Sequence, residues 1–226
     1  VGRAPGTDMI SARALSVDGK PRFNEFPQQV ELLQRMLGDE NYRPAVNPKP
    51  ESPAAVWMLG SSTESAALAG ERGLPYNFAL FINPQMDARI LEYYRHQFQP
   101  SAECQTPYCS LTVNVTCAES EEQAQILARC RQISFLRFAS GKGDSRICTP
   151  EEAASVVLSE DEEAFIQQRS ALAAIGTPTQ VRDKLFDLAD QYGADELMTV
   201  TITYDFAARK RSYELLAEAF ELSASQ

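Results

Sequence analysis

The sequence predicts an α/β fold with a parallel sheet, corresponding to about half of an eight-stranded (β/α)8 TIM barrel. The first observation is an alternation: segments with strand patterning are each followed by a segment whose apolar residues recur at helical spacing. The second is that the chain contains four such units. A strand, a helix and a return to the same sheet produce parallel pairing, so four units account for half of the eight in a barrel.

The segment before the first strand is predicted to be helical. Residues 10–15 form a short predicted helix, and residues 25–37 form a longer one with Val30 and Leu33 on one face. A proline-rich connection at 43–53 then leads to the first strand, at 56–59.

Turn and capping residues separate the later elements. Gly73 is a natural end for the helix that begins at Ser62, because glycine accepts the left-handed conformation found after a helix C-terminus, and Pro75 cannot continue that helix. The stretch 135–149 has turn chemistry and weak periodicity, so it is predicted to be an excursion between barrel elements. The remaining predicted strands are 77–82, 110–117 and 196–203, and the remaining predicted helices are 86–98, 121–133, 150–175, 180–192 and 207–222.

Composition narrows the class of protein. The 226 residues carry 31 acidic and 21 basic side chains, a net charge of -10. Such a chain lacks the basic surface that attracts nucleic acid, so we expect no nucleic-acid partner. The sequence has no apolar run of about 20 residues, the length that spans a bilayer, and no charged and then apolar leader. We therefore expect a cytoplasmic protein with no membrane partner.

Cysteine usage argues against structural crosslinks. The five cysteines are odd in number and lack paired CxxC spacing, which speaks against both a disulfide framework and a zinc site. We expect reduced thiols and no metal site.

The most informative motif lies where the first strand meets its helix. Leu59 and Gly60 are followed by Ser61, Ser62 and an alanine-rich helical segment. Glycine lets the backbone come close to a ligand, and the N-terminus of a helix attracts anions through its unpaired N–H groups and its dipole. The turn is therefore a candidate phosphate site, with hydroxyl donors at Ser61, Ser62 and Ser65. The alternative is that a serine here only caps the helix.

The beginning of the chain has the character of a loop. Val1 is followed at once by Gly2, Arg3 and a further Ala-Pro-Gly turn sequence. We interpret this as the loop at the end of a strand that has been removed, and we expect residues 1–226 to be a single barrel domain that lacks its first strands. Such a fragment would leave two unpaired strand edges, so we expect it to dimerise or aggregate.

Six segments together resemble the luciferase-like family of flavin-dependent monooxygenases, and the resemblance covers nearly the whole chain. Their order and spacing make the assignment specific, whereas each alone would be weak. The segments are 2–8 (GRAPGTD), 57–62 (WMLGSS), 73–79 (GLPYNFA), 94–101 (YRHQFQPS), 176–181 (GTPTQV) and 195–198 (DELM).

The resemblance implies a flavin-dependent monooxygenase with a (β/α)8 barrel. Reduced FMN, supplied by a separate flavin reductase, and molecular oxygen would act on a small organic substrate, and full-length relatives commonly form homodimers. Arg3 matches a family arginine that reaches the cofactor; its alternative is a surface arginine beside Asp8. The implied cofactor-binding residues are Arg3, Leu59, Gly60, Ser61, Ser62, Thr63 and Ser65.

The resemblance leaves the catalytic residues unassigned. Family members carry about four further strands before the position of Val1, and those strands supply polar residues around the flavin ring. Two alternatives therefore stay open: a truncated, non-catalytic flavin-binding homologue, and an oxidoreductase that uses a deazaflavin.

Other polar residues are weaker candidates. His96 is the only histidine, but its predicted helix lies outside the strands, so a solvated side chain is the better interpretation. Glu119 and Glu121 are better explained as the acidic start of a helix than as catalytic acids. Residues 204–206 (YDF) follow the last strand at the ligand end and are second-tier candidates.

Overall fold

The structure is a computed structural model of the chain, and it describes residues 1–3, 9–39, 41–44, 47–48, 52, 54–141 and 146–222. The chain forms two compact units. The first comprises Val1–Phe78 and Ile90–Cys109, and the second comprises Ala79–Arg89 and Ser110–Gln226.

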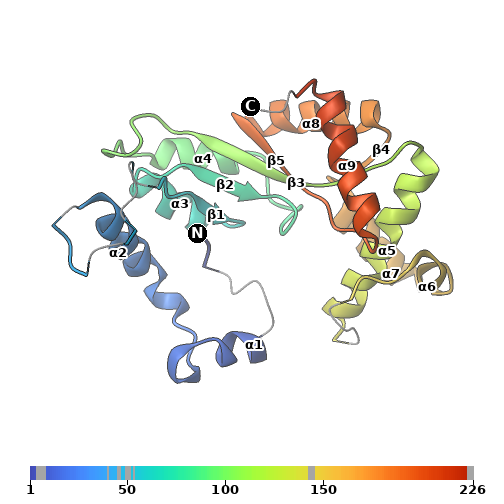
Figure 1. Cartoon of the computed structure of the whole chain (residues 1–226), viewed down its shortest axis with the longest axis horizontal. Helices are drawn as coiled ribbons and strands as arrows, with labels where there is room; N and C mark the ends of the chain where they lie inside the picture. Colours follow the sequence, from blue (N-terminus) through green and yellow to red (C-terminus); the bar gives the residue numbers. More distant parts are fainter. Residues whose placement is uncertain are drawn as a thin grey trace. The chain divides into compact units, whose positions relative to one another are not determined.

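The first unit begins with helices and continues with two parallel strands (Figure 1). Met58 of the first strand pairs with Tyr76 of the second, and Gly60 pairs with Phe78. Its elements are α1 (Met9–Ala14), two short 3-10 turns (Val17–Gly19 and Phe23–Glu25), α2 (Phe26–Gly38), β1 (Met58–Gly60), α3 (Thr63–Glu71), β2 (Tyr76–Ala79) and α4 (Ile90–Gln97).

A small residue lets α3 and α4 approach closely. A Cβ added to Gly70 would lie 2.9 Å from the backbone carbonyl carbon of Gln97 and 3.0 Å from the carbonyl oxygen of Tyr94, so only glycine fits there. The Tyr94 hydroxyl donates to the carbonyl oxygen of Leu74 over 2.9 Å. Gly73 adopts a φ of 61° just after α3, as predicted.

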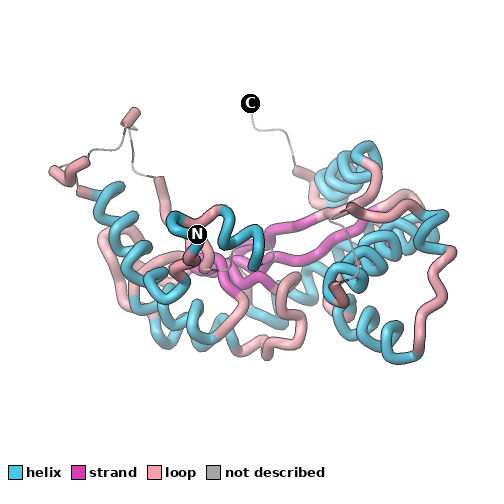
Figure 2. Tube along the Cα trace, turned by 90° about the horizontal axis from the view of Figure 1, so that it is seen from below, coloured by secondary structure: helices cyan, strands magenta, loops and turns pink. Residues whose placement is uncertain are grey.

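The second unit is built on β3, which is buried along its whole length. β3 pairs in parallel with β5 from Ser110 to Asn114 and with β4 from Val115 to Cys117. Figure 2 draws the strands in magenta, and β3 and β5 run side by side. The elements are β3 (Cys109–Cys117), α5 (Glu121–Ala139), α6 (Pro150–Ala154), α7 (Glu160–Ser170), β4 (Ala174–Gly176), α8 (Pro178–Tyr192), β5 (Glu196–Val200) and α9 (Phe206–Ala219).

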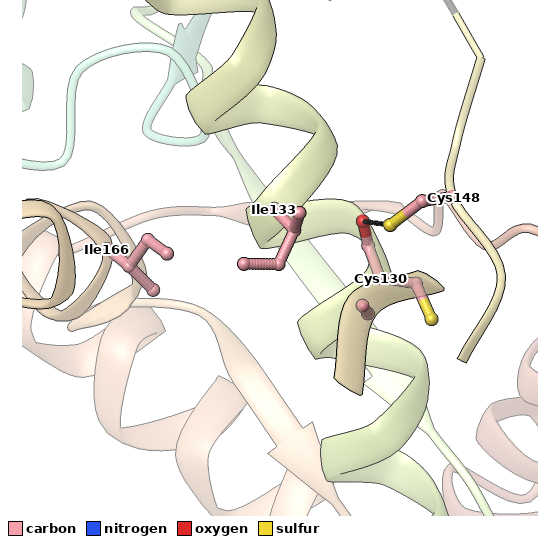
Figure 3. Packing of buried hydrophobic residues seen from close by; sticks show 5 residues of the cluster. Cys130, Ile133, Cys148 and Ile166 are labelled. Atoms are coloured by element: carbon pink, nitrogen blue, oxygen red, sulfur yellow. Dashed lines mark hydrogen bonds between the residues drawn. The ribbon is translucent and has the colours of Figure 1, made fainter. Parts of the chain in front are cut away.

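A buried cluster joins α5, α6 and α7 in this unit. Figure 3 shows Ile133 of α5 and Ile166 of α7 directed toward each other. The Cys148 thiol donates to the carbonyl oxygen of Cys130 over 3.2 Å, and burial raises the pKa of the Cys130 thiol to about 11. All five cysteines are free thiols, as expected.

The structure corrects several element boundaries. The predicted strands 77–82 and 196–203 each end three residues earlier, at Ala79 and Val200. α5 continues to Ala139, so the predicted excursion at 135–149 begins later; residues 142–145 of it lie outside the described residues. The predicted helix 150–175 is instead α6, α7 and the short strand β4, because Ser159 begins a new helix with its own capping box. The helix predicted at 86–98 begins only at Ile90. The four predicted strands are all present, and none of the described helices is long and apolar enough to cross a bilayer.

Candidate functional site

The first residue of the chain lies beside β1. The amino group of Val1 donates to the carbonyl oxygen of Trp57 over 2.6 Å, and the Leu59 amide donates to the carbonyl oxygen of Val1 over 2.7 Å. These are the two hydrogen bonds of a parallel bridge between Val1 and Met58. The start of the chain therefore extends in the same direction as β1.

This pairing sets Arg3 beside the carboxyl end of β1. A Cβ on Gly2 would lie 3.1 Å from the carbonyl oxygen of Leu59, so the two segments remain in close contact one residue further on. The same register brings Arg3 level with Gly60. The rest of the predicted loop, residues 4–8, lies outside the described residues.

Gly60 ends β1 at a position with no room for a side chain. A Cβ there would overlap the Cβ and Oγ atoms of Ser65. The first turn of α3 thus folds back directly against the end of the strand. The sequence predicted a glycine that lets the backbone come close to a ligand; the side on which Gly60 lacks a Cβ faces Ser65.

Ser62 and Ser65 form the cap of α3. The Ser65 amide donates to Ser62 Oγ over 3.4 Å, and the Ser62 amide donates to Ser65 Oγ over 3.3 Å. The Ser65 hydroxyl donates in turn to the carbonyl oxygen of Ser62 over 2.7 Å. The capping interpretation is therefore right for these two serines, whose hydroxyl groups hold the turn in shape.

Tyr76 supports the cap from the neighbouring strand. Its hydroxyl lies 3.0 Å from Ser65 Oγ, and burial raises the pKa of Tyr76 to about 12. Tyr76 was not predicted to be a residue of this site. Its contact depends on the register of β1 against β2, for which the sequence carries no local signal.

The N-terminus of α3 stabilises negative charge. Hydrogen bonds from the Ser62 hydroxyl and from its own backbone N–H hold the pKa of Glu64 below its ordinary value, and the positive charge of Arg3 lowers it further. Arg3 therefore lies close enough to act on an anion at this helix end. Glu64 was not among the residues predicted for this site.

Arg3 also lines a cavity of about 490 Å³ in the first unit. This volume is typical of a pocket for a small organic molecule. The remaining lining comes from the segment Val1–Gly2 and from the helical region before β1, and consists of Ala12, Leu15, Ser16, Pro21, Arg22, Phe23, Phe26, Gln29, Val30 and Leu33.

The weaker candidates have structural roles. The His96 side chain is 72% exposed on α4, with Nε2 3.7 Å from Glu92, as expected of a solvated helix residue. Glu119 accepts from Arg211 over 2.9 Å, and Glu121 accepts from a glutamine of α8 over 3.1 Å. Both glutamates belong to the surface around the start of α5.

Asp205 is the N-cap of α9. Its Oδ1 accepts a hydrogen bond from the Ala208 amide over 2.7 Å, so this carboxylate caps the helix. Tyr204 and Phe206 on either side are exposed.

Comparison with known proteins agrees with this fold. The family model of the luciferase-like monooxygenases matches residues 2–196. A protein of Escherichia coli K12 named luciferase-like monooxygenase is 31% identical over 98% of this chain and 66% of its own length. This chain thus spans about two-thirds of that relative.

Solved structures show the same architecture. The crystal structure of apo-MsnO8 matches with a TM-score of 0.85 and 33% identity, over 98% of this chain and 68% of that chain. The oxygenating constituent of 3,6-diketocamphane monooxygenase from Pseudomonas putida, in complex with FMN, shares the fold at 18% identity, with a TM-score of 0.57, over 97% of this chain and 69% of that chain. The chain has the α/β fold of part of a luciferase-like TIM barrel, and it belongs to the luciferase-like monooxygenase family.

Proposed function

We propose that this chain is part of a single-domain barrel enzyme that uses reduced FMN and molecular oxygen to oxygenate a small organic substrate. The turn from Leu59 to Ser65, together with Arg3, binds the phosphate of FMN. The observation that carries the proposal is the convergence at the end of β1: Arg3, the Gly60 turn and the N-terminus of α3 lie together, and the carboxylate of Glu64 is stabilised there.

The residues present fit a phosphate dianion. The first N–H groups of α3, including that of Thr63, face the helix end where negative charge is favoured. Arg3 supplies the positive charge, and Ser61 adds a hydroxyl donor. Ser62 and Ser65 act differently, because their hydroxyls fix the shape of the turn. Leu59 and Gly60 contribute backbone that comes close to the ligand.

The chain provides binding and enclosure, while bound FMN supplies the chemistry that activates oxygen. The relative from Pseudomonas putida was solved with FMN, which supports this choice of cofactor. The cavity beside Arg3 is walled by Phe23, Phe26 and Val30, and so gives the organic substrate an apolar environment from which water is displaced. A separate reductase supplies the reduced flavin, and the full-length protein is a homodimer.

The test removes the serine hydroxyls of the turn. In the full-length protein, replacing Ser61 and Ser62 together with alanine should weaken FMN binding by about tenfold or more. The phosphate loses the Ser61 hydrogen bond, which contributes about 1.5–3 kcal/mol for a charged partner, and the turn loses the Ser62 cap that holds its shape. Fluorescence titration measures the affinity.

Ser120→Ala is the matched control. Ser120 caps α5 as Ser62 caps α3, accepting from the Gln123 amide over 3.2 Å. Both substitutions remove a cap that stabilises a helix by about 1 kcal/mol, but only the change at α3 should alter FMN binding. Unchanged affinity in the Ser61 and Ser62 double variant would refute the assignment.

A further inference from the structure

Two arginines of the second unit line one small cavity. Arg131 extends from α5 and Arg169 from α7, and both are partly buried. The guanidinium carbon of Arg169 lies 4.9 Å from the ring centre of Phe135. Phe135 is stacked on Phe165, with ring centres 6.3 Å apart and 7° between the planes. The cavity therefore has cationic groups within aromatic walls, which Phe81 completes.

The two positive charges are not paired with a carboxylate in the part of the chain that the structure describes. Among the residues that the structure describes, no aspartate or glutamate forms an ion pair with Arg131 or Arg169. The neighbouring Glu163 is already engaged by Arg129, through hydrogen bonds of 3.1 and 2.8 Å. Burial lowers the pKa of Arg131 to about 10, and the positive charge of Arg169 lowers it as well.

Two adjacent cations of this kind are unfavourable without an anion. Removing a charge from water costs several kcal/mol unless it is paired, and each guanidinium also repels the other. The helices cannot separate freely to relieve this, because Ile133 and Ile166 pack between α5 and α7 (Figure 3). The packing thus holds both guanidinium groups beside the same space.

The size and polarity of that space indicate which anion fits. The cavity volume is about 20 Å³, close to what one water-sized atom requires. Ser170 also lines the cavity. Its Oγ accepts a hydrogen bond from Gln132 Nε2 over 3.1 Å, so its own O–H proton remains available to donate to a ligand. Guanidinium groups bind carboxylate oxygens through paired N–H donors. An oxygen of a flat carboxylate fits, with the rest of the molecule toward the opening.

We propose that Arg131 and Arg169, with Ser170, form a binding site for a small carboxylate. The site is separate from the phosphate-binding turn proposed above, since all its residues belong to the second unit. It therefore does not depend on that proposal.

Thermal unfolding of the full chain in sodium formate tests this, with sodium chloride replaced by formate at constant ionic strength. Formate should raise the melting temperature of the wild-type chain to a plateau. Arg169→Gln should lower the apparent formate affinity at least tenfold, and Arg131→Gln should do the same. Arg182→Gln is the control, because Arg182 is a surface arginine of α8 outside the cavity, and it should leave the response unchanged.

Two outcomes would overturn the proposal. One is a wild-type melting temperature that does not differ between formate and chloride. The other is a formate response in Arg169→Gln equal to that of the wild type, which would mean that the arginine only packs on Phe135. If Arg131→Gln fails to fold by circular dichroism, Arg169→Gln and a titration of the wild-type arginine Nε–H signals by NMR decide the question.

Discussion

At the scale of single residues, Gly60 is the position in the turn with the least room for a side chain. Its backbone lies where any Cβ would overlap Ser65 Cβ, an atom that cannot rotate away because it is attached to the α3 backbone. We expect Gly60→Ala to lower the free energy of unfolding by about 1–3 kcal/mol, as overpacking does in well-packed sites. Denaturant unfolding measures this.

Gly38→Ala is the matched control for that substitution. Gly38 ends α2, and a Cβ there would meet nothing within 4 Å. We expect no loss of stability, and a gain of up to about 1 kcal/mol from the better helix propensity of alanine. Equal destabilisation by both substitutions would contradict the packing of Ser65 against Gly60.

The residues of the candidate site differ in how far the sequence predicts them. The serine-rich turn after Leu59 is visible because glycine and serine at a strand and helix junction have known conformational roles. The contact that holds the Ser65 hydroxyl in place is not visible in the sequence, since it depends on the position of the Tyr76 hydroxyl across the sheet. Glu64 could not be assigned either, because its lowered pKa depends first on hydrogen bonds from the Ser62 hydroxyl and its own backbone N–H at the folded helix end, and then on Arg3, 61 positions earlier in the chain.

At the scale of elements, those with clear periodicity were predicted, and the short strand β4 was not. β3 and α8 follow clear alternation and helical spacing, so their positions agree with the sequence within two residues. β4 has only three residues, too few for alternation to show, and it is defined by its parallel pairing with Val115–Cys117. The break between α6 and α7 was missed because the glutamate-rich sequence around Ser159 favours helix on both sides.

The interactions at the start of α6 predict that the stability of the fold depends on pH. Arg146 donates two hydrogen bonds of 2.9 Å to Glu152, whose carboxylate also accepts from the Thr149 amide over 2.8 Å. These interactions lower the pKa of Glu152 from 4.5 to about 2. A carboxyl with a lowered folded-state pKa stabilises the fold above its unfolded value, and this contribution is lost as the pH falls from 4.5 toward 2.

Glu152→Gln should therefore reduce stability near neutral pH, and the difference from the wild type should shrink below pH 4.5. Urea unfolding across this range measures it. Glu162→Gln is the control: Glu162 holds the same capping position in α7, where the described residues supply no arginine partner. A difference between wild type and Glu152→Gln that stays constant from pH 6 to about 2 would contradict the role of the Arg146 pair.

At the scale of the whole molecule, the family could be predicted from the sequence because its motifs are distributed along the chain in a fixed order. The match over residues 2–196 agrees with that resemblance. The organic substrate could not be predicted, since the chain covers about two-thirds of the length of its relatives and substrate pockets are assembled from many separate loops.

The proposed phosphate site at the end of β1 is tested most directly by comparing FMN with riboflavin, which lacks the phosphate. Calorimetry on the full-length protein should show FMN binding about tenfold or more tightly than riboflavin, because in our proposal the phosphate forms charged hydrogen bonds at the α3 N-terminus. In Arg3→Gln this preference should fall, while Arg182→Gln should retain it. Equal affinity of the wild-type protein for FMN and riboflavin would contradict the account.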